Sequence, residues 1–143
     1  MRINDVIAAK SDQVVVTVQP DASVRQLVAL LAEHNVGALV VSSDGTTVEG
    51  IVSERDVVRQ LHHTPDVLDA TVASIMTNEV HTCGPADLLD DMMTLMTQRR
   101  VRHVPVLVDG SLAGIISIGD VVKHKISALE FERDQLDSYV HQT

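Results

Sequence analysis

The sequence predicts an α/β (α+β) fold of two β-α-β-β-α repeats, related by a pseudo-two-fold axis and followed by a C-terminal helix. The first observation is an internal repeat, because segments of one half return about 65 residues later. The second is size: 143 residues, 45% of them hydrophobic, can bury one core but are few for two independent domains. The third is a heptad pattern confined to the end of the chain. We therefore expect two halves of one module, with two related clefts at their junction.

Three pairs of segments carry the repeat. They are Thr17-Val18-Gln19-Pro20 with Thr82-Cys83-Gly84-Pro85, VGALVVSSDG from residue 36 with VRHVPVLVDG from residue 101, and GIVSERDVV from residue 50 with GIISIGDVV from residue 114. Polar residues that recur in register are therefore judged as paired sites.

The first part of each repeat predicts a leading helical turn, a strand and a helix. Apolar residues near Ile3 and Val72 favour the turns, and β-branched runs predict the strands Val14 to Val18 and Val80 to Thr82. Apolar residues at helical spacing then predict helices from Asp21 to His34, capped by Asp21 or Ser23, and from Ala86 to Arg99.

The second part of each repeat predicts a hairpin that leads into another helix. The continuous apolar run Gly37 to Val41 indicates a strand buried on both faces. Asp44-Gly45 and Asp109-Gly110 are typical of hairpin turns before strands near Gly50 to Val52 and Gly114 to Ile116. We divide the chain into repeats at 1–63 and 64–125 and a C-terminal amphipathic helix at 126–143.

The C-terminal helix has a short apolar seam at heptad spacing. Its members are Ile126, Leu129, Arg133, Leu136 and Val140. This seam predicts either a helix that pairs with a second copy or one that lies on its own module.

Composition excludes several classes of protein. The net charge of −9 disfavours nonspecific nucleic-acid binding, and Phe131 and Tyr139 alone cannot form a base-stacking platform within the repeats. Neither a membrane-spanning run nor a secretion signal is visible. A single cysteine, Cys83, rules out an intramolecular disulfide and makes a cysteine-based zinc site implausible. We expect a cytoplasmic protein.

Two recurring turns are the strongest candidates for chemistry, namely Ser53-x-x-Asp56 and Ser117-x-x-Asp120. Each follows a strand at a helix N-terminus, where backbone N–H groups and the helix dipole suit a phosphate and the aspartate suits a ribose diol. The alternative is that each serine simply caps its helix. Recurrence in both repeats favours a site.

A basic cluster lies in the second repeat. Arg102 and His103 are candidate phosphate ligands at a strand edge, whereas Arg99 and Arg100 fit a structural role at a helix C-terminus. Arg55 either reaches a phosphate or pairs with a neighbouring acid. Histidine spacing indicates no metal site, and no catalytic triad is visible, so we expect no enzyme.

These motifs together strongly resemble a tandem cystathionine β-synthase (CBS) domain pair, over roughly residues 1 to 125. The chain looks like a small stand-alone bacterial protein of this family. The resemblance implies a homodimer and an adenosine-containing ligand between the repeats. AMP or NAD(H) is the first choice, and ATP, ADP or S-adenosylmethionine fits the same resemblance.

The resemblance also implies which residues form the two sites. The preferred site would use Thr17, Ala22, Val36, Gly37, Arg102, His103, Ile115, Ser117 and Asp120. The second site would use Ala38, Ile51, Ser53, Arg55, Asp56, Thr82 and Val101. Asp87 stands where the first repeat has Ala22, and this carboxylate counts against the second site.

We therefore expect an adenine-nucleotide sensor, with no metal and no catalytic cofactor, that signals to an unidentified protein by changing shape. One alternative is a structural dimerisation adaptor with empty clefts. A less favoured alternative is a nucleotide-acting enzyme.

Overall fold

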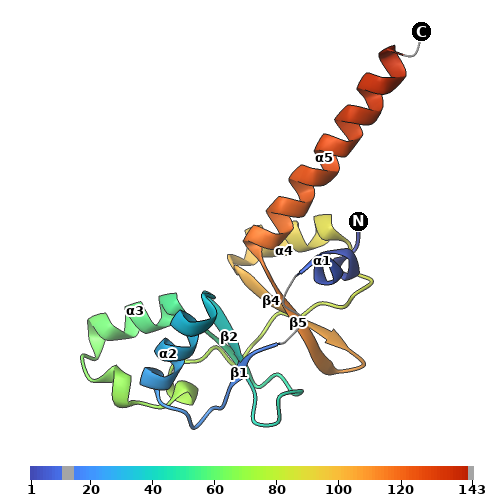
Figure 1. Cartoon of the computed structure of the whole chain (residues 1–143). Helices are drawn as coiled ribbons and strands as arrows, with labels where there is room; N and C mark the ends of the chain where they lie inside the picture. Colours follow the sequence, from blue (N-terminus) through green and yellow to red (C-terminus); the bar gives the residue numbers. More distant parts are fainter. Residues whose placement is uncertain (11–14, 142–143) are drawn as a thin grey trace.

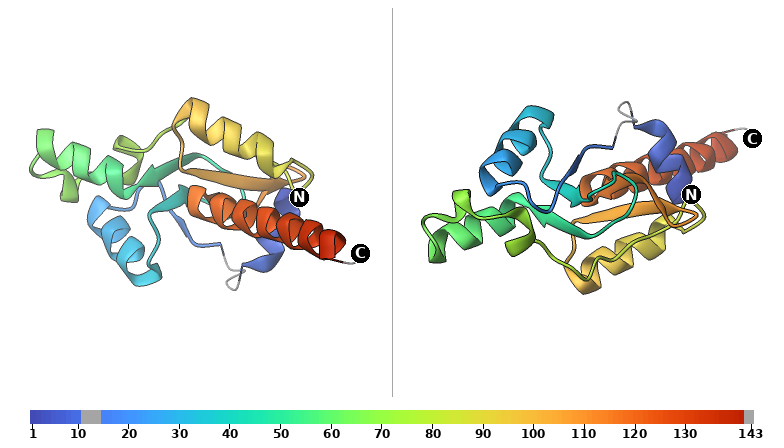
Figure 2. Two further views of the ribbon diagram at one scale, coloured as in Figure 1. Left: turned by 90° about the horizontal axis from the view of Figure 1, so that it is seen from above. Right: turned by 90° about the horizontal axis from the view of Figure 1, so that it is seen from below.

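A computed structural model describes residues 1–10 and 15–141 of the chain (Figure 1). The elements are α1 (Ile3–Ala9), β1 (Thr17–Val18), α2 (Val24–His34), β2 (Ala38–Val41), β3 (Gly50–Ser53), α3 (Glu54–His63), the 3-10 turns η1 (Val67–Asp69) and η2 (Val72–Ser74), α4 (Leu89–Arg99), β4 (His103–Val108), β5 (Ser111–Ser117) and α5 (Ile118–His141). In the views of Figure 2, α2 and α3 lie at one end of the molecule and α1, α4 and α5 at the other. The predicted fold class of two mixed α/β repeats and a C-terminal helix is confirmed.

The first half has a three-stranded sheet. β2 is central, parallel to β1 and antiparallel to β3. All four residues of β2 are buried, as its continuous apolar sequence predicted. β1 is shorter than the predicted strand, whose first residue, Val14, lies outside the described residues.

The second half has a two-stranded hairpin, and the predicted strand Val80 to Thr82 is wrong. Only Cys83 pairs there, in a single parallel bridge to Val106. Its N–H donates to the carbonyl of Pro105 at 3.0 Å, and its carbonyl accepts from Leu107 N–H at 2.8 Å. Pro85 follows two residues later and has no N–H with which to extend the ladder.

The two Asp-Gly pairs form different turns. Asp109 and Gly110 have φ values of 51° and 81°, as a tight two-residue hairpin between β4 and β5 requires. Asp44 instead organises a longer loop between β2 and β3, where its carboxylate accepts the N–H groups of Thr46 and Thr47 at 2.8 and 2.7 Å. Eight residues separate Val41 from Gly50 and seven separate the equivalent Val106 from Gly114, which gives the one-residue change in the offset of the repeat.

Both predicted helices after the first strands begin about one turn late. Ser23 caps α2, because its hydroxyl accepts the Gln26 N–H at 3.1 Å and Gln26 Oε1 accepts the Ser23 N–H at 3.0 Å. α4 begins at Leu89 and has no side-chain cap. A cap therefore marks the start of α2 but not that of α4.

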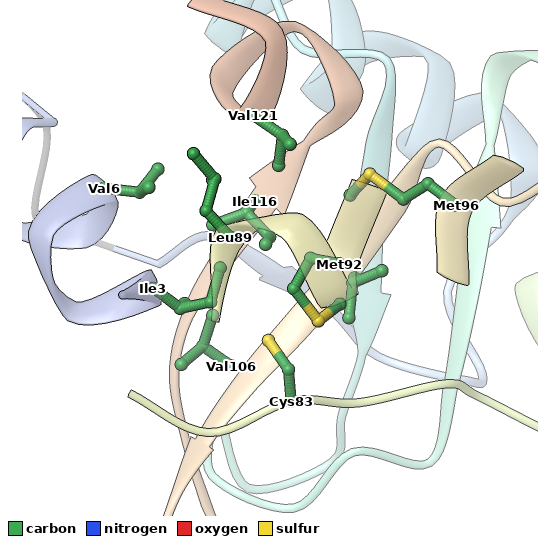
Figure 3. Packing of buried hydrophobic residues seen from close by; sticks show 10 residues of the cluster. Ile3, Val6, Cys83, Leu89, Met92, Met96, Val106, Ile116 and Val121 are labelled. Carbon is green, nitrogen blue, oxygen red and sulfur yellow. The ribbon is translucent and has the colours of Figure 1, made fainter. Parts of the chain in front are cut away.

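The leading segments are exchanged between the halves. Ile3 and Val6 of α1 are fully buried in the core of the second half, beside Leu89, Met92 and Ile116 (Figure 3). Reciprocally, Val72 of η2 is buried in the core of the first half. Each half of the sequence therefore completes the hydrophobic core of the other.

α5 is one continuous helix of 24 residues that joins the last predicted helix of the second repeat to the C-terminal segment. Val121 in its first turn is fully buried, and Lys125 pairs with Asp90 of α4 at 3.0 Å. Beyond this point the helix projects away from the module (Figure 1). Within the described part of the chain, we found no helix with the length and apolar character needed to cross a membrane.

Candidate functional site

One cleft gathers polar residues from both halves, and we call it the β3–α3 cleft. Its volume is about 490 Å³, within the range of small-ligand pockets. The first half contributes Gly37, Ala38, Ile51, Ser53, Glu54, Arg55, Asp56 and Arg59. The segments 77–81 and 100–103 contribute Thr77, Glu79, Val80, His81, Arg100, Val101, Arg102 and His103.

The Ser53–Asp56 turn lies at one side of this cleft as a reciprocal cap of α3. Asp56 Oδ2 accepts the Ser53 N–H at 2.8 Å and the Ser53 hydroxyl at 3.1 Å, and Ser53 Oγ accepts the Asp56 N–H at 3.2 Å. The capping role weighed from the sequence is therefore confirmed. Among the described residues these bonds use Oδ2 of Asp56, which leaves Oδ1 for a ligand.

The N-terminus of α3 has fewer free backbone N–H groups for binding an anion than the sequence suggested. The Glu54 N–H donates to the carbonyl of Gly37 at 2.9 Å, and the Asp56 N–H is bonded to Ser53. The equivalent Ile118 N–H donates to the carbonyl of Arg102 at 2.8 Å. Any phosphate in these clefts must therefore rely mainly on side chains.

Four guanidinium groups line the β3–α3 cleft and supply positive charge for an anion. They belong to Arg55, Arg59, Arg100 and Arg102. Three carboxylates also line the cleft, from Glu54, Asp56 and Glu79. With the histidines neutral the lining is therefore slightly positive, although the whole chain carries −9. Such a local excess attracts anions against the global repulsion.

His103 lies beside the start of β2. A Cβ placed on Gly37 would lie 3.5 Å from His103 Nε2 and 3.6 Å from Glu54 Oε1, so the three residues meet closely. Burial lowers the pKa of His103 below 6.5, and Lys10 and Arg102 lower it too, although Glu54 and Asp120 act in the opposite direction. His103 therefore favours its neutral form.

A second cavity, the α1–β5 cavity, is smaller and largely aliphatic. Its volume is about 320 Å³. Its lining is Asn4, Ile7, Ala8, Lys10, Val15, Val16, His34, Val36, Ala38, Leu39, Val40, Ala113, Gly114 and Ile115. It is the pseudo-symmetric counterpart of the β3–α3 cleft, because Ile7 meets Gly114 where Met76 meets Gly50.

Lys10 holds the carboxylate expected to bind ribose in this cavity. Its ammonium group donates to Asp120 Oδ2 at 2.9 Å and to the carbonyl of Ile115 at 2.8 Å. Asp120 Oδ2 also accepts the Ser117 N–H at 2.9 Å. Burial would raise the pKa of Asp120, but the hydrogen bonds from Ser117 and Lys10 outweigh it and leave that pKa below 3.8.

In the structure, the residues predicted for the preferred site do not line a single cavity. Val36 and Ile115 line the α1–β5 cavity, whereas Gly37, Arg102 and His103 line the β3–α3 cleft. Thr17 and Ala22 line a separate open groove along α2. Ser117 and Asp120 adjoin the α1–β5 cavity only through Lys10 and Ile115.

Most of the residues predicted for the second site line one cleft, unlike those predicted for the preferred site. All residues of the second set line the β3–α3 cleft except Thr82, which is exposed. Sequence reasoning missed Thr77, Val80 and His81 in this cleft, and Lys10 in the other cavity. The apolar pairs Val6-Ile7 and Ile75-Met76 are equivalent in the two leading segments. Aligning the segments on these pairs sets Ala8 against Thr77 and Lys10 against Glu79. This alignment is the sequence signal that could have revealed the missed residues.

Two observations concern metal and thiol chemistry. Within residues 1–10 and 15–141, no three His, Cys, Asp or Glu side chains are grouped to hold a metal ion. Burial, aided by the charge of Asp87, raises the pKa of Cys83 to about 12, which disfavours a reactive thiolate.

Comparisons with known proteins agree with this architecture. A family model described as CBS domain matches residues 5–63 and 72–127. The mitochondrial CBS domain-containing protein CBSX3 of Arabidopsis thaliana is 37% identical over 125 residues, or 84% of this chain. The chain spans 61% of the length of that relative.

Two solved structures complete the comparison. A protein with CBS domains from Burkholderia ambifaria has a TM-score of 0.84 and 38% identity, covering 89% of this chain and 95% of its own. The CBS domain pair of protein MJ0100, in complex with 5′-methylthioadenosine and S-adenosyl-L-methionine, has a TM-score of 0.76 and 21% identity, covering 86% and 98%. At that identity, the second likeness concerns the fold.

Proposed function

The chain belongs to the CBS-domain family, and from that premise we propose that it is a regulatory module that binds an adenosine phosphate in the β3–α3 cleft. AMP is the smallest ligand with all the required groups, and ADP, ATP and NAD(H) share them. One observation carries the proposal: a single cleft joins an aliphatic wall, a Ser-x-x-Asp turn and four arginines.

The aliphatic wall suits a nucleobase. Ala38, Ile51, Val80 and Val101 line the cleft from different segments, and no Phe, Tyr or Trp lies among its lining residues. A flat purine can be held between aliphatic groups, because burial of apolar area stabilises it without ring stacking.

Asp56 and Thr77 suit the ribose. Oδ1 of Asp56 can accept a hydrogen bond from a sugar hydroxyl. The backbone of Thr77 is fixed by reciprocal hydrogen bonds with Ile51 at 3.0 and 2.9 Å, so its side chain is presented from a rigid position. Fixed groups on both sides of a cleft reduce the entropy lost on binding.

The arginines favour a phosphate over a cationic group. Charge-assisted hydrogen bonds from guanidinium groups to phosphate are among the stronger polar contacts. The MJ0100 domain pair is described with a sulfonium ligand and a neutral thioether, both containing adenosine. In this chain the four arginines oppose a sulfonium, so we expect AMP to bind better than S-adenosylmethionine.

A ligand in this cleft would bridge the two halves of the sequence. Asp56 and Arg55 come from the first half, and Arg102 and His103 from the second. Binding therefore favours the arrangement in which both walls contact the nucleotide, which can pass a signal to another protein.

Calorimetry with AMP, adenosine and S-adenosylmethionine tests the proposal. Asp56→Asn should weaken AMP binding about ten- to a hundredfold, since a hydrogen bond to a charged group contributes about 1.5–3 kcal/mol. Arg102→Ala should weaken AMP binding more than adenosine binding.

Asp120→Asn is the matched control, because it alters the equivalent turn of the other half. It should leave AMP affinity in the β3–α3 cleft unchanged. If Asp120→Asn abolishes binding and Asp56→Asn does not, the nucleotide occupies the α1–β5 cavity. If no adenine nucleotide raises the melting temperature of the wild type, the nucleotide function itself is wrong.

A further inference from the structure

The two Ser-x-x-Asp turns have similar geometry but unequal access to the cavities beside them. The Ser53 N–H donates to Asp56 at 2.8 Å, and the Ser117 N–H donates to Asp120 at 2.9 Å. Ser53 and Asp56 line the β3–α3 cleft. Ser117 and Asp120 are not among the described residues that line the α1–β5 cavity, whereas Lys10 is. The difference therefore lies in the residue beside the turn and not in the turn itself.

Lys10 stands between Asp120 and the α1–β5 cavity. It follows α1 directly, and its ammonium group donates to Asp120 Oδ2 at 2.9 Å and to the carbonyl of Ile115, a lining residue, at 2.8 Å. The side chains of Lys10 and Asp120 are only 32% and 26% exposed, so water screens their attraction less than that of a surface pair. A sugar hydroxyl that approached Asp120 from the cavity would have to compete with this ammonium group.

The equivalent position in the other leading segment carries the opposite charge. Aligning the two segments on their apolar pairs sets Lys10 against Glu79, which lines the β3–α3 cleft. An ionised carboxylate cannot donate a hydrogen bond to Asp56. None of the ion pairs among the described residues involves Asp56. Asp56 therefore stays open to the cleft that it lines.

We propose that this one position determines which cavity accepts an adenosine ligand. Lys10 closes the α1–β5 cavity to ribose by holding Asp120, and Glu79 leaves Asp56 accessible in the β3–α3 cleft. Lys10 is thus a specificity-determining residue. The inference rests on the proposed function, because it concerns the choice between two carboxylates for one ribose.

The charges of the two cavities favour the same division. Lys10 is the one formally charged residue among the described lining residues of the α1–β5 cavity, and Asp120 compensates its charge. A phosphate that drew Lys10 away would leave Asp120 partly buried without its cation, which is costly. The β3–α3 cleft has four arginines, and none of them forms an ion pair within the described part of the chain. A phosphate can therefore bind there without separating an existing pair.

A gain of binding tests the role of Lys10. Lys10→Met removes the ammonium group and keeps most of the length of the side chain. Adenosine is the probe, because the described lining of the α1–β5 cavity contains no arginine and a neutral ligand suits its aliphatic wall. Methyl NMR signals of Ile51 and Ile115 report the two cavities separately, since each residue lines one of them. In the wild type adenosine should shift Ile51 and leave Ile115 unchanged, whereas in Lys10→Met both signals should shift and saturate.

Lys125→Met is the matched control. Lys125 also pairs with an aspartate, Asp90 of α4, at 3.0 Å, and its side chain is 33% exposed against 32% for Lys10. Its removal should leave Ile115 unresponsive to adenosine. An Ile115 signal that shifts in the wild type, or one that stays unchanged in Lys10→Met, overturns the proposal. A wild type in which neither adenosine nor AMP shifts Ile51 rejects the proposed function instead, and Ile115 still decides the role of Lys10.

The reverse exchange tests the equivalent position. Glu79→Lys would place an ammonium group where Lys10 lies in the other half, and it should weaken AMP binding in calorimetry about tenfold although it adds positive charge to the cleft. Glu79→Gln is its control, because it removes the same negative charge without adding a cation, and it should bind AMP at least as tightly as the wild type. If Glu79→Lys binds AMP as tightly as Glu79→Gln, the position does not control access to Asp56 and the proposal is wrong.

Discussion

His103 is the residue at which the charges of both cavities meet. Glu54 of the β3–α3 cleft faces it, as do Asp120 and Lys10 beside the α1–β5 cavity and Arg102 of its own segment. Burial is the largest influence, and it lowers the pKa of His103 below 6.5. A histidine held neutral by the fold makes folding stability depend on pH.

The sign of that dependence gives a prediction. Below pH 6.5 the unfolded chain binds a proton at His103 more readily than the folded protein does. Stability from this residue is therefore fully present above pH 6.5 and declines as the pH falls towards the folded-state pKa. Urea denaturation between pH 7.5 and 5 should show wild type losing stability relative to His103→Gln. Parallel stability curves for the two proteins would contradict it.

Two glycines mark where the exchanged segments cross the hairpins. A Cβ on Gly50 would lie 2.6 Å from Met76 Sδ and 2.9 Å from the carbonyl oxygen of Thr77. A Cβ on Gly114 would lie 2.8 Å from Ile7 Cδ1. The crossing at Gly50 leaves less room for a side chain than the crossing at Gly114. The carbonyl of Thr77 is part of the backbone and cannot move away, whereas the end of the Ile7 side chain can change its rotamer.

Gly50→Ala should therefore destabilise the protein by about 1–3 kcal/mol, the usual cost of overpacking. Gly114→Ala should cost less. Gly84→Ala is the control, since the nearest atom to its Cβ would be the Leu107 carbonyl oxygen at 3.8 Å, and its effect should stay within about 0.5 kcal/mol. Urea denaturation measures all three, and equal losses at Gly50 and Gly84 would show that the crossing is not tightly packed.

Local patterns predicted most elements, and tertiary contacts decided the rest. The apolar run before Ser42 predicted β2, and the Ser-x-x-Asp turns predicted the caps of α3 and α5. The strand expected at Val80 to Thr82 failed, because only Cys83 comes into register with β4. β-branched composition favours an extended chain but does not supply a partner strand.

At the scale of the whole molecule, the exchange of leading segments determines which polar side chains line each cleft. The internal repeat in the sequence does not reveal this exchange, because similarity between the halves does not show which hydrophobic core a leading segment packs into. The exchange brings Thr77 and His81 to the β3–α3 cleft, and Lys10 to the other cavity. The sequence analysis identified the Ser-x-x-Asp turns and Arg102 but preferred the turn that Lys10 already engages.

The exchange also predicts that the two halves unfold together. Ile3 lies in the leading helix of the first repeat yet is fully buried in the core of the second half. Ile3→Val should lower the free energy of unfolding by about 0.5–1.5 kcal/mol. Methyl NMR signals from Val52 in the first core and Ile116 in the second should then lose their folded intensity at one common, lowered urea midpoint. If the midpoint of Ile116 fell while that of Val52 stayed at the wild-type value, the halves would be independent, because an interlocked pair of cores cannot lose one without exposing the other.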